Sequence, residues 1–239
     1  MDIAGAFTAE NRSFADVVAG ADPDLPVPAC PGWTIRNLMT HVGRGDRWAA
    51  TLVTTRAEDW IDPRTVDGGK PPADPDAALD WLTAGPTILL DAVATDPDAP
   101  VWTFVGPRPA SWWVRRRLHE VLVHRADALL ALNTPIDDDP TRSADAIDEW
   151  LSLVADRNTP VLDEGHTLHL HTTDAPGEWT LRPEGNGVAC DPTHAKATTA
   201  LRGPAMDLLL VLLRRLPPDQ VEVFGDRTTL TTFLDRTPF

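Results

Sequence analysis

Tyrosine is absent from this 239-residue sequence, and cysteine occurs only twice. Without tyrosine, no phenol is available as a catalytic acid or as an anion-binding group. Cys30 and Cys190 are far apart and neither belongs to a Cys-x-x-Cys pair, so we expect no disulfide framework. We interpret both as ordinary small residues rather than as nucleophiles.

Basic residues are also few: 21 Lys and Arg stand against 36 Asp and Glu, which gives a formal net charge of −15. Nucleic-acid-binding proteins normally present a basic face, so this balance counts against such a partner. The run Arg115, Arg116, Arg117 is a local exception. We expect it to pair with acidic neighbours or to attract an anionic substrate.

Long apolar runs are missing as well. No stretch of about 18 apolar residues occurs, so we expect no membrane span. The first residues, MDIAGAFTAENRSF, lack a basic start followed by an apolar segment, so we expect no secretory signal. Together these absences predict a cytoplasmic protein.

The spacing of apolar residues differs between the two parts of the chain. It is helical up to about residue 158, whereas short alternating segments about ten residues apart predict strands beyond residue 160. Helices followed by strands indicate an α+β protein. We expect a helical metal-binding domain over 1–150 and a small α/β domain with a mainly antiparallel sheet over 151–239, with the boundary between 134 and 165. The expected helices cover about 3–19, 34–52, 76–94, 111–132, 143–158 and 204–216, with a short terminal helix, and the expected strands cover about 167–173, 178–182, 187–192, 195–203 and 221–225.

Glu120 and His124 form the most informative pair in the sequence. They lie four residues apart in an expected helix, so a carboxylate and an imidazole face the same side one turn apart. His41, in an earlier expected helix, is a third candidate ligand. Three protein ligands leave one position open on a zinc ion, which distinguishes catalytic from closed structural sites. Other divalent metals also bind His and carboxylate ligands.

Two other interpretations of the titratable residues stay open. A buried Glu120 needs a partner, and Arg117 or Arg125 on the same helix would serve as well as a metal. A second candidate metal cluster consists of histidines in an expected strand region, where residues two apart point to the same face. Its members are His166, His169 and His171, while His194 is expected to be exposed.

Three segments resemble one known family. CPGWTIRNLMTHVGRGDRWA, RRRLHEVLVHRADALLALNTP and GPAMDLLLVLLRRLPPDQVEVFGD resemble the second-helix, fourth-helix and C-terminal signatures of the mycothiol-dependent maleylpyruvate isomerases. The resemblance covers about residues 28–226. It implies a DinB-like four-helix bundle as the N-terminal domain and a small C-terminal α/β domain similar to sterol carrier proteins.

The resemblance also implies particular site residues. It implies zinc held by His41, Glu120 and His124, the same residues to which the spacing points. It further implies a functional arginine near the end of the C-terminal apolar helix, where family members commonly have Gly-Arg. The chain has Arg214-Arg215 there, so Arg215 is the expected catalytic residue and Arg214 the alternative.

The implied activity is that of a zinc-dependent enzyme that uses mycothiol as an activated thiolate. A thiol that coordinates a metal is deprotonated. The thiolate would isomerise a cis double bond of maleylpyruvate type by addition, rotation and elimination, or would be transferred to an electrophilic small molecule. The alternative of another class is a non-catalytic metal-binding regulatory protein, and the set of three rather than four ligands favours catalysis.

Overall fold

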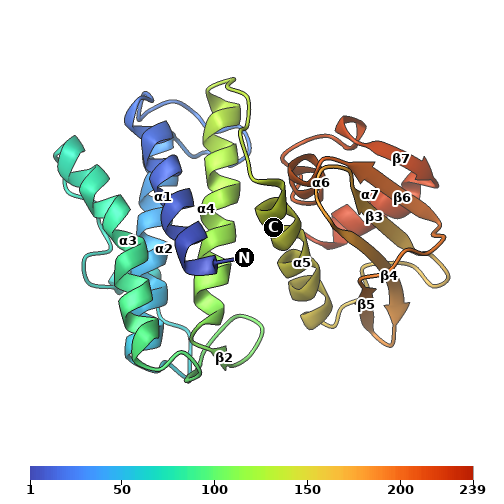
Figure 1. Cartoon of the computed structure of the whole chain (residues 1–239), viewed down its shortest axis with the longest axis horizontal. Helices are drawn as coiled ribbons and strands as arrows, with labels where there is room; N and C mark the ends of the chain where they lie inside the picture. Colours follow the sequence, from blue (N-terminus) through green and yellow to red (C-terminus); the bar gives the residue numbers. More distant parts are fainter. Residues whose placement is uncertain (239) are drawn as a thin grey trace. The chain divides into compact units, whose positions relative to one another are not determined.

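The computed structural model of the chain describes residues 1–238 and has the α+β fold that the sequence predicts. It divides into two compact units, Met1–Ile136 and Asp137–Phe239. Helices build the first unit, whereas helices and a five-stranded sheet build the second (Figure 1). The last residue of the expected second domain, residue 239, lies outside the described residues.

The first unit is a four-helix bundle with short loop elements at its ends. Its helices are α1 (Ile3–Ala19), α2 (Ile35–Thr54), α3 (Pro75–Thr95) and α4 (Trp112–Ala131), and its loops hold a 3-10 helix, η1 (Pro63–Thr65), and the paired strands β1 (Pro100–Val101) and β2 (Arg108–Pro109). α1 packs against α3 and α4, and α2 packs against α3 and α4 (Figure 1). Fully buried side chains such as Phe7, Phe14, Leu38, Leu52 and Leu118 fill the core.

Local sequence explains where the bundle helices begin. The side chains of Asp2 and Asp74 accept hydrogen bonds from the first turns of α1 and α3. Thr34 and Asn37 form a capping box at the start of α2. The capping box fixes the first turn of the helix that carries His41.

Glycines in α2 allow close approach of neighbouring side chains. A Cβ at Gly45 would lie 2.6 Å from Cζ of Arg117, and a Cβ at Gly43 would lie 2.2 Å from the Trp81 ring. The space beside Gly45 is filled by the Arg117 guanidinium, which donates to Oδ1 of Asp46 at 2.8 Å. Asp46 is fully buried, so this pair offsets the cost of removing its charge from water. The packing of α2 on α3 therefore depends on Gly43, and its packing on α4 depends on Gly45.

Within residues 1–238, one helix, α3, has the length and mean hydropathy (1.2) needed to cross a membrane. It packs against α1 and α2 and buries Leu82, Leu89 and Val93 in the bundle. Core helices of soluble proteins pass the same test of length and composition. This helix is therefore weak evidence for a membrane span.

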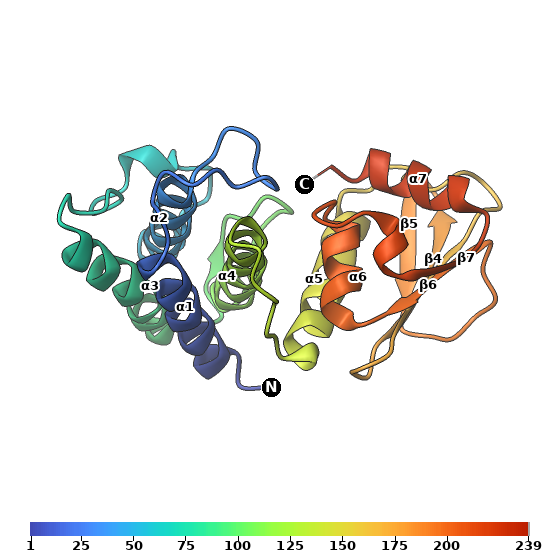
Figure 2. The same ribbon diagram turned by 90° about the horizontal axis from the view of Figure 1, so that it is seen from above.

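The second unit consists of a mixed sheet with helices. Its elements are α5 (Pro140–Asp156), β3 (Leu168–Thr172), β4 (Glu178–Glu184), β5 (Gly187–Asp191), β6 (Thr199–Gly203), α6 (Ala205–Leu212), η2 (Pro218–Gln220), β7 (Glu222–Gly225) and α7 (Arg227–Arg236). The strand order is β5-β4-β3-β6-β7, antiparallel except for the β3–β6 pair. α5 and α6 pack on each other and on the sheet (Figure 2).

The position of α5 sets the boundary between the two units. The sequence interpretation placed the boundary between residues 134 and 165 and drew the domains as 1–150 and 151–239. The compact units divide at residues 136/137, inside that interval but before this helix. The reason is packing: α5 contacts α6 and β5, and the indole of Trp179 in β4 donates to Asp148 of α5 at 3.3 Å. A helix can thus follow a bundle in sequence and still belong to the next unit.

Candidate active site

The bundle brings together the three residues proposed as metal ligands, His41 from α2 and Glu120 and His124 from α4. Nε2 of His41 lies 3.4 Å and Nε2 of His124 lies 3.6 Å from Oε2 of Glu120. Two ligands of a tetrahedral zinc ion, each about 2.0–2.1 Å from the metal, are about 3.3 Å apart. The observed spacing is close to this value, and one donor atom from each side chain lies within 4.8 Å of the other two. The three side chains therefore fit a zinc ion.

The charge of Glu120 suits a metal ligand. Burial raises its pKa, but the Arg116 guanidinium and hydrogen bonds from His124 and His41 outweigh burial and hold the pKa well below its usual range. The carboxylate is therefore ionised at neutral pH. A carboxyl group must be deprotonated to bind a metal, and this one is already prepared.

The sequence offered Arg117 or Arg125 as a partner that could neutralise Glu120 in place of a metal. The structure shows ion pairs with Arg116 and Arg117. Arg116, one turn earlier on α4, forms the short ion pair with Oε1, and Arg117 is more distant, at 3.8 Å from Oε2. Arg125, the other arginine that the sequence offered, pairs with Glu10 of α1. The arginine contacts leave Oε2 directed towards the two histidines.

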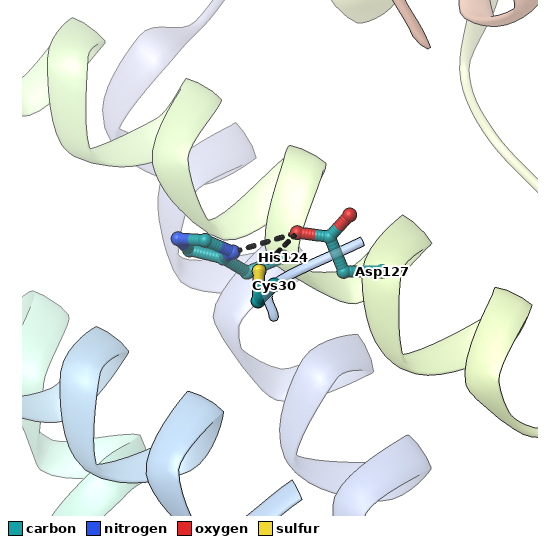
Figure 3. A group of neighbouring side chains, drawn as sticks. All are labelled: Cys30, His124 and Asp127. Atoms are coloured by element: carbon teal, nitrogen blue, oxygen red, sulfur yellow. Dashed lines mark hydrogen bonds and ion pairs between the residues drawn. The ribbon is translucent and has the colours of Figure 1, made fainter. Parts of the chain in front are cut away.

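His124 is held by a carboxylate behind it. Nδ1 of His124 hydrogen-bonds to Oδ2 of Asp127 at 2.9 Å, and the Cys30 thiol donates to the same oxygen at 3.6 Å (Figure 3). A carboxylate at Nδ1 fixes the ring so that Nε2 is presented to a metal. Burial lowers the pKa of His124, but the contacts with Asp127, Cys30 and Glu120 raise it to about 10.

Sequence reasoning missed Asp127 and Cys30. Asp127 follows His124 by three residues, so the helical period alone places both on one face of α4. Cys30 lies in the loop before α2 and is brought to this point by tertiary structure. Cys30, His124 and Asp127 also form a donor set within 4.8 Å, but Asp127 is fully buried and neither it nor Cys30 lines the adjoining cavity. Of the two sets, only the one that contains His41 and Glu120 has residues that line this cavity.

The imidazole of His41 lies between Trp33 and the other histidine. Its ring centroid is 5.0 Å from Trp33 and 4.9 Å from His124. Burial lowers the pKa of His41 despite the opposing hydrogen bond with Glu120, which favours the neutral, ligating form. Trp33 belongs to the CPGW segment and limits the rotation of His41.

A cavity of about 430 Å³ opens beside this group of donors and is walled by His41 and Glu120. The indoles of Trp48 and Trp113 form part of the wall. They pack edge to face, with their ring centroids 5.1 Å apart. Arg44 and Arg64 also line this cavity. The combination of aromatic walls and positive groups suits a small, flat anion.

The predicted catalytic arginine, Arg215, lies in the second unit directly after α6. Its backbone N–H donates to Leu210 at 2.7 Å and closes the helix end. Arg214 before it has a φ of 59°, the left-handed conformation that glycine adopts most easily. The left-handed conformation at Arg214 is compatible with a glycine at this position, as in the Gly-Arg pair that the resemblance implies. The catalytic role of Arg215 stays a prediction.

The first unit is a helical bundle that gathers two imidazoles and a carboxylate beside a cavity, and an α/β unit follows it in the chain. Residues 4–129 match the family described as the mycothiol maleylpyruvate isomerase N-terminal domain, and residues 142–232 match the one described as the MDMPI C-terminal domain. The chain belongs to the mycothiol maleylpyruvate isomerase family, which confirms the resemblance seen in the sequence.

Solved structures show the same fold. The chain is similar to the crystal structure of the mycothiol-dependent maleylpyruvate isomerase, with 17% identity, a TM-score of 0.61, and coverage of 93% of this chain and 91% of that chain. A histidine-to-alanine mutant of that isomerase gives 16% identity, a TM-score of 0.62 and the same coverage. No curated protein matches the sequence significantly.

Proposed function

We propose that this protein is a mycothiol-dependent isomerase with zinc, or a similar divalent metal, held by His41, Glu120 and His124. The observation that carries the proposal is the convergence of these three donor atoms, two of which belong to residues that line one cavity, His41 and Glu120. Membership of the family supports mycothiol as the thiol and a cis double bond of maleylpyruvate type as the reacting group. The free cysteines, Cys30 and Cys190, are consistent with a reducing compartment such as the cytoplasm.

The reaction needs an ionised sulfur and a way to accommodate charge on the substrate. A zinc ion at the three ligands would provide a position where a low-molecular-weight thiol loses its proton. Sulfur adds to one carbon of the double bond, the resulting single bond rotates, and elimination of the thiol restores the double bond in the trans form. No atoms are gained or lost over the cycle.

Residues around the ligands prepare them for this role. Arg116 keeps Glu120 ionised, and Asp127 holds His124 with Nε2 towards Glu120. Because these contacts restrain the ligand side chains, we expect little side-chain reorganisation when a metal binds. The proposed catalyst is therefore preorganised, which lowers the cost of reaching the transition state.

The substrate is proposed to be a small anion with an electron-poor double bond. Arg44 and Arg64 supply positive charge at the cavity, and guanidinium groups bind carboxylates with two parallel hydrogen bonds. Arg44 is already oriented, because its Nε donates to the Gly69 carbonyl at 2.9 Å. Arg215 is proposed to stabilise negative charge that develops on the substrate oxygen.

Transfer of the thiol to an electrophile would use the same residues, and product analysis separates the two reactions. We expect purified protein with mycothiol and maleylpyruvate to give the trans isomer with mycothiol regenerated. A stable sulfur adduct detected by mass spectrometry with any member of an electrophile panel would instead indicate an S-transferase. Zinc binding without thiol turnover would support a non-catalytic regulatory protein and contradict the proposal.

His124→Ala tests the site itself. The variant should lose thiol-dependent turnover and zinc binding at this site, with the helical circular dichroism signal retained. Full activity of the variant would contradict the assigned ligand set. His119→Ala is not a suitable control because His119 is buried, so His166→Ala, in the second unit, serves as the matched histidine variant.

A further inference from the structure

A second group of metal-binding side chains lies on the sheet of the second unit. His169 comes from β3, Glu178 from the first residue of β4, and His194 from the loop after β5. One donor atom of each lies within 4.8 Å of the other two. The sequence pointed to His166, His169 and His171, but the structure turns His166 to Thr229, 3.1 Å from its hydroxyl, and adds Glu178 and His194 in its place.

The strand register explains how this group forms. Leu168 and Leu170 are fully buried, and Leu170 is paired with Trp179, whose indole reaches α5. His169 and His171 alternate with these leucines and face the opposite side of the sheet. His171 pairs across the strands with Glu178, which places the carboxylate beside both imidazoles.

Three imidazoles surround one oxygen atom of Glu178. Oε1 lies 3.2 Å from Nε2 of His169, 2.9 Å from Nδ1 of His171 and 2.5 Å from Nδ1 of His194. A carboxylate oxygen has about two lone-pair positions, so it cannot accept three good hydrogen bonds. In the part of the chain that the structure describes, residues 1–238, Nε2 of His169 accordingly makes no hydrogen bond. His169 is only 6% exposed, and a buried polar nitrogen without a hydrogen bond is costly.

A bound cation would remove this deficit. The 3.2 Å between Nε2 of His169 and Oε1 of Glu178 matches the separation of about 3.3 Å expected for two ligands of one tetrahedral zinc ion.

His194 can adjust to complete the ligand set. Its side chain is 76% exposed, so it can leave the hydrogen bond to Glu178 and take a ligand position without repacking. The loop that carries it is fixed to the sheet, because the Thr180 hydroxyl donates to the Thr193 carbonyl at 2.7 Å. His171 remains hydrogen-bonded to Glu178 and orients the carboxylate, the usual position of a residue behind a metal ligand.

We propose that His169, Glu178 and His194 form a second divalent-metal site, of a type that prefers imidazole-binding ions such as Zn²⁺, and that His171 positions the carboxylate. The site is separate from the one in the bundle and does not depend on the proposed activity. Its ion would tie the loop after β5 to β3 and β4.

Zinc titration of the full-length, tag-free, metal-stripped protein by isothermal calorimetry tests this proposal. We expect about two zinc ions per chain for the wild type and about one for His194→Ala, an exposed position where the substitution does not disturb packing. Glu178→Gln should give the same loss, and His171→Ala should weaken this site by about 10–100-fold. His166→Ala, a histidine of the same unit outside the group, should bind as the wild type does.

The outcomes separate this site from the bundle site. His41→Ala should remove the other zinc ion and leave the one that His194→Ala removes, so the double variant should bind none. Unchanged stoichiometry and affinity in both His194→Ala and Glu178→Gln would overturn the second site. Loss of zinc only in His194→Ala, with no change in His41→Ala, would support it and contradict the proposed function instead.

Discussion

The thiol of Cys190 illustrates how strongly a single environment changes reactivity. Burial, followed by the charges of Asp148 and Asp191, raises its pKa to about 12. The thiolate is the reactive form, so at pH 8 alkylation by iodoacetamide should be about a thousandfold slower than for a free cysteine with a pKa of about 8.5. Because deprotonation becomes more complete as pH rises towards 12, the rate should increase about tenfold per pH unit from 8 to 10.

Mass spectrometry of the Cys190 peptide over time provides this measurement. A short cysteine peptide in the same reaction is the control. Modification of Cys190 at the rate of the peptide at pH 8 would show that the burial described for this thiol is wrong.

Arg214 and Arg215 offer a matched pair of substitutions. Arg215→Ala should retain zinc and lose turnover, because the guanidinium is proposed to stabilise charge on the substrate. Arg214→Gly should retain turnover and leave stability unchanged or raise it by up to about 1 kcal/mol, since glycine relieves the left-handed strain at φ 59°. Steady-state kinetics and urea unfolding measure both effects. Loss of activity in Arg214→Gly but not in Arg215→Ala would show that Arg214, not Arg215, has the catalytic role.

At the residue level, local spacing was enough to select residues that the bundle brings together, but not their environment. Glu120 and His124 are one helical turn apart, a relation that the sequence displays directly. Asp127 is also within one helical turn of His124. With 36 acidic residues in the chain, however, the sequence alone does not indicate that this one contacts the histidine. Arg116 as the partner of Glu120 depends on side-chain direction, which spacing does not give.

Gly45 is the position in α2 where an added methyl group has the clearest consequence. Its Cβ would lie 2.6 Å from the Arg117 guanidinium, which is buried against Asp46 and cannot move without breaking that pair. Gly45→Ala should therefore destabilise the protein by about 1–3 kcal/mol. Gly20→Ala is the control, because a Cβ there meets no atom within 4 Å in the described structure.

Urea unfolding measured at one protein concentration compares the two glycine variants. The prediction is a lower midpoint for Gly45→Ala and little change for Gly20→Ala. Equal midpoints for Gly45→Ala and the wild type would mean that Arg117 and α2 can separate at low cost.

At the level of elements, periodicity and capping predicted the helices and strands well but predicted their ends less accurately. The expected helix at 204–216 ends earlier, at Leu212, because Arg214 leaves the helical conformation. The expected strand at 195–203 begins only at Thr199, where pairing with β3 and β7 starts. Backbone turns that rely on non-glycine residues give no signal in composition.

For the whole molecule, the α+β class and the family were predictable, but the assignment of α5 was not. A bundle helix and a helix that covers a sheet have the same apolar period, so only packing distinguishes them. The parallel pairing of β3 with β6 likewise joins strands separated by two others in sequence. Non-local pairing of this kind is not encoded in the alternation of either strand.

The central claim is that His41, Glu120 and His124 hold a metal at which a thiol is ionised. Optical absorption of the cobalt-substituted protein on addition of mycothiol tests it most directly, because a thiolate bound to cobalt gives an intense charge-transfer band. The measurement uses the His194→Ala variant, so that the second site binds no cobalt. We predict a band that saturates at about one thiol per chain. The double variant with His124→Ala should give no band. Absence of the band, or its persistence in the double variant, would contradict the account.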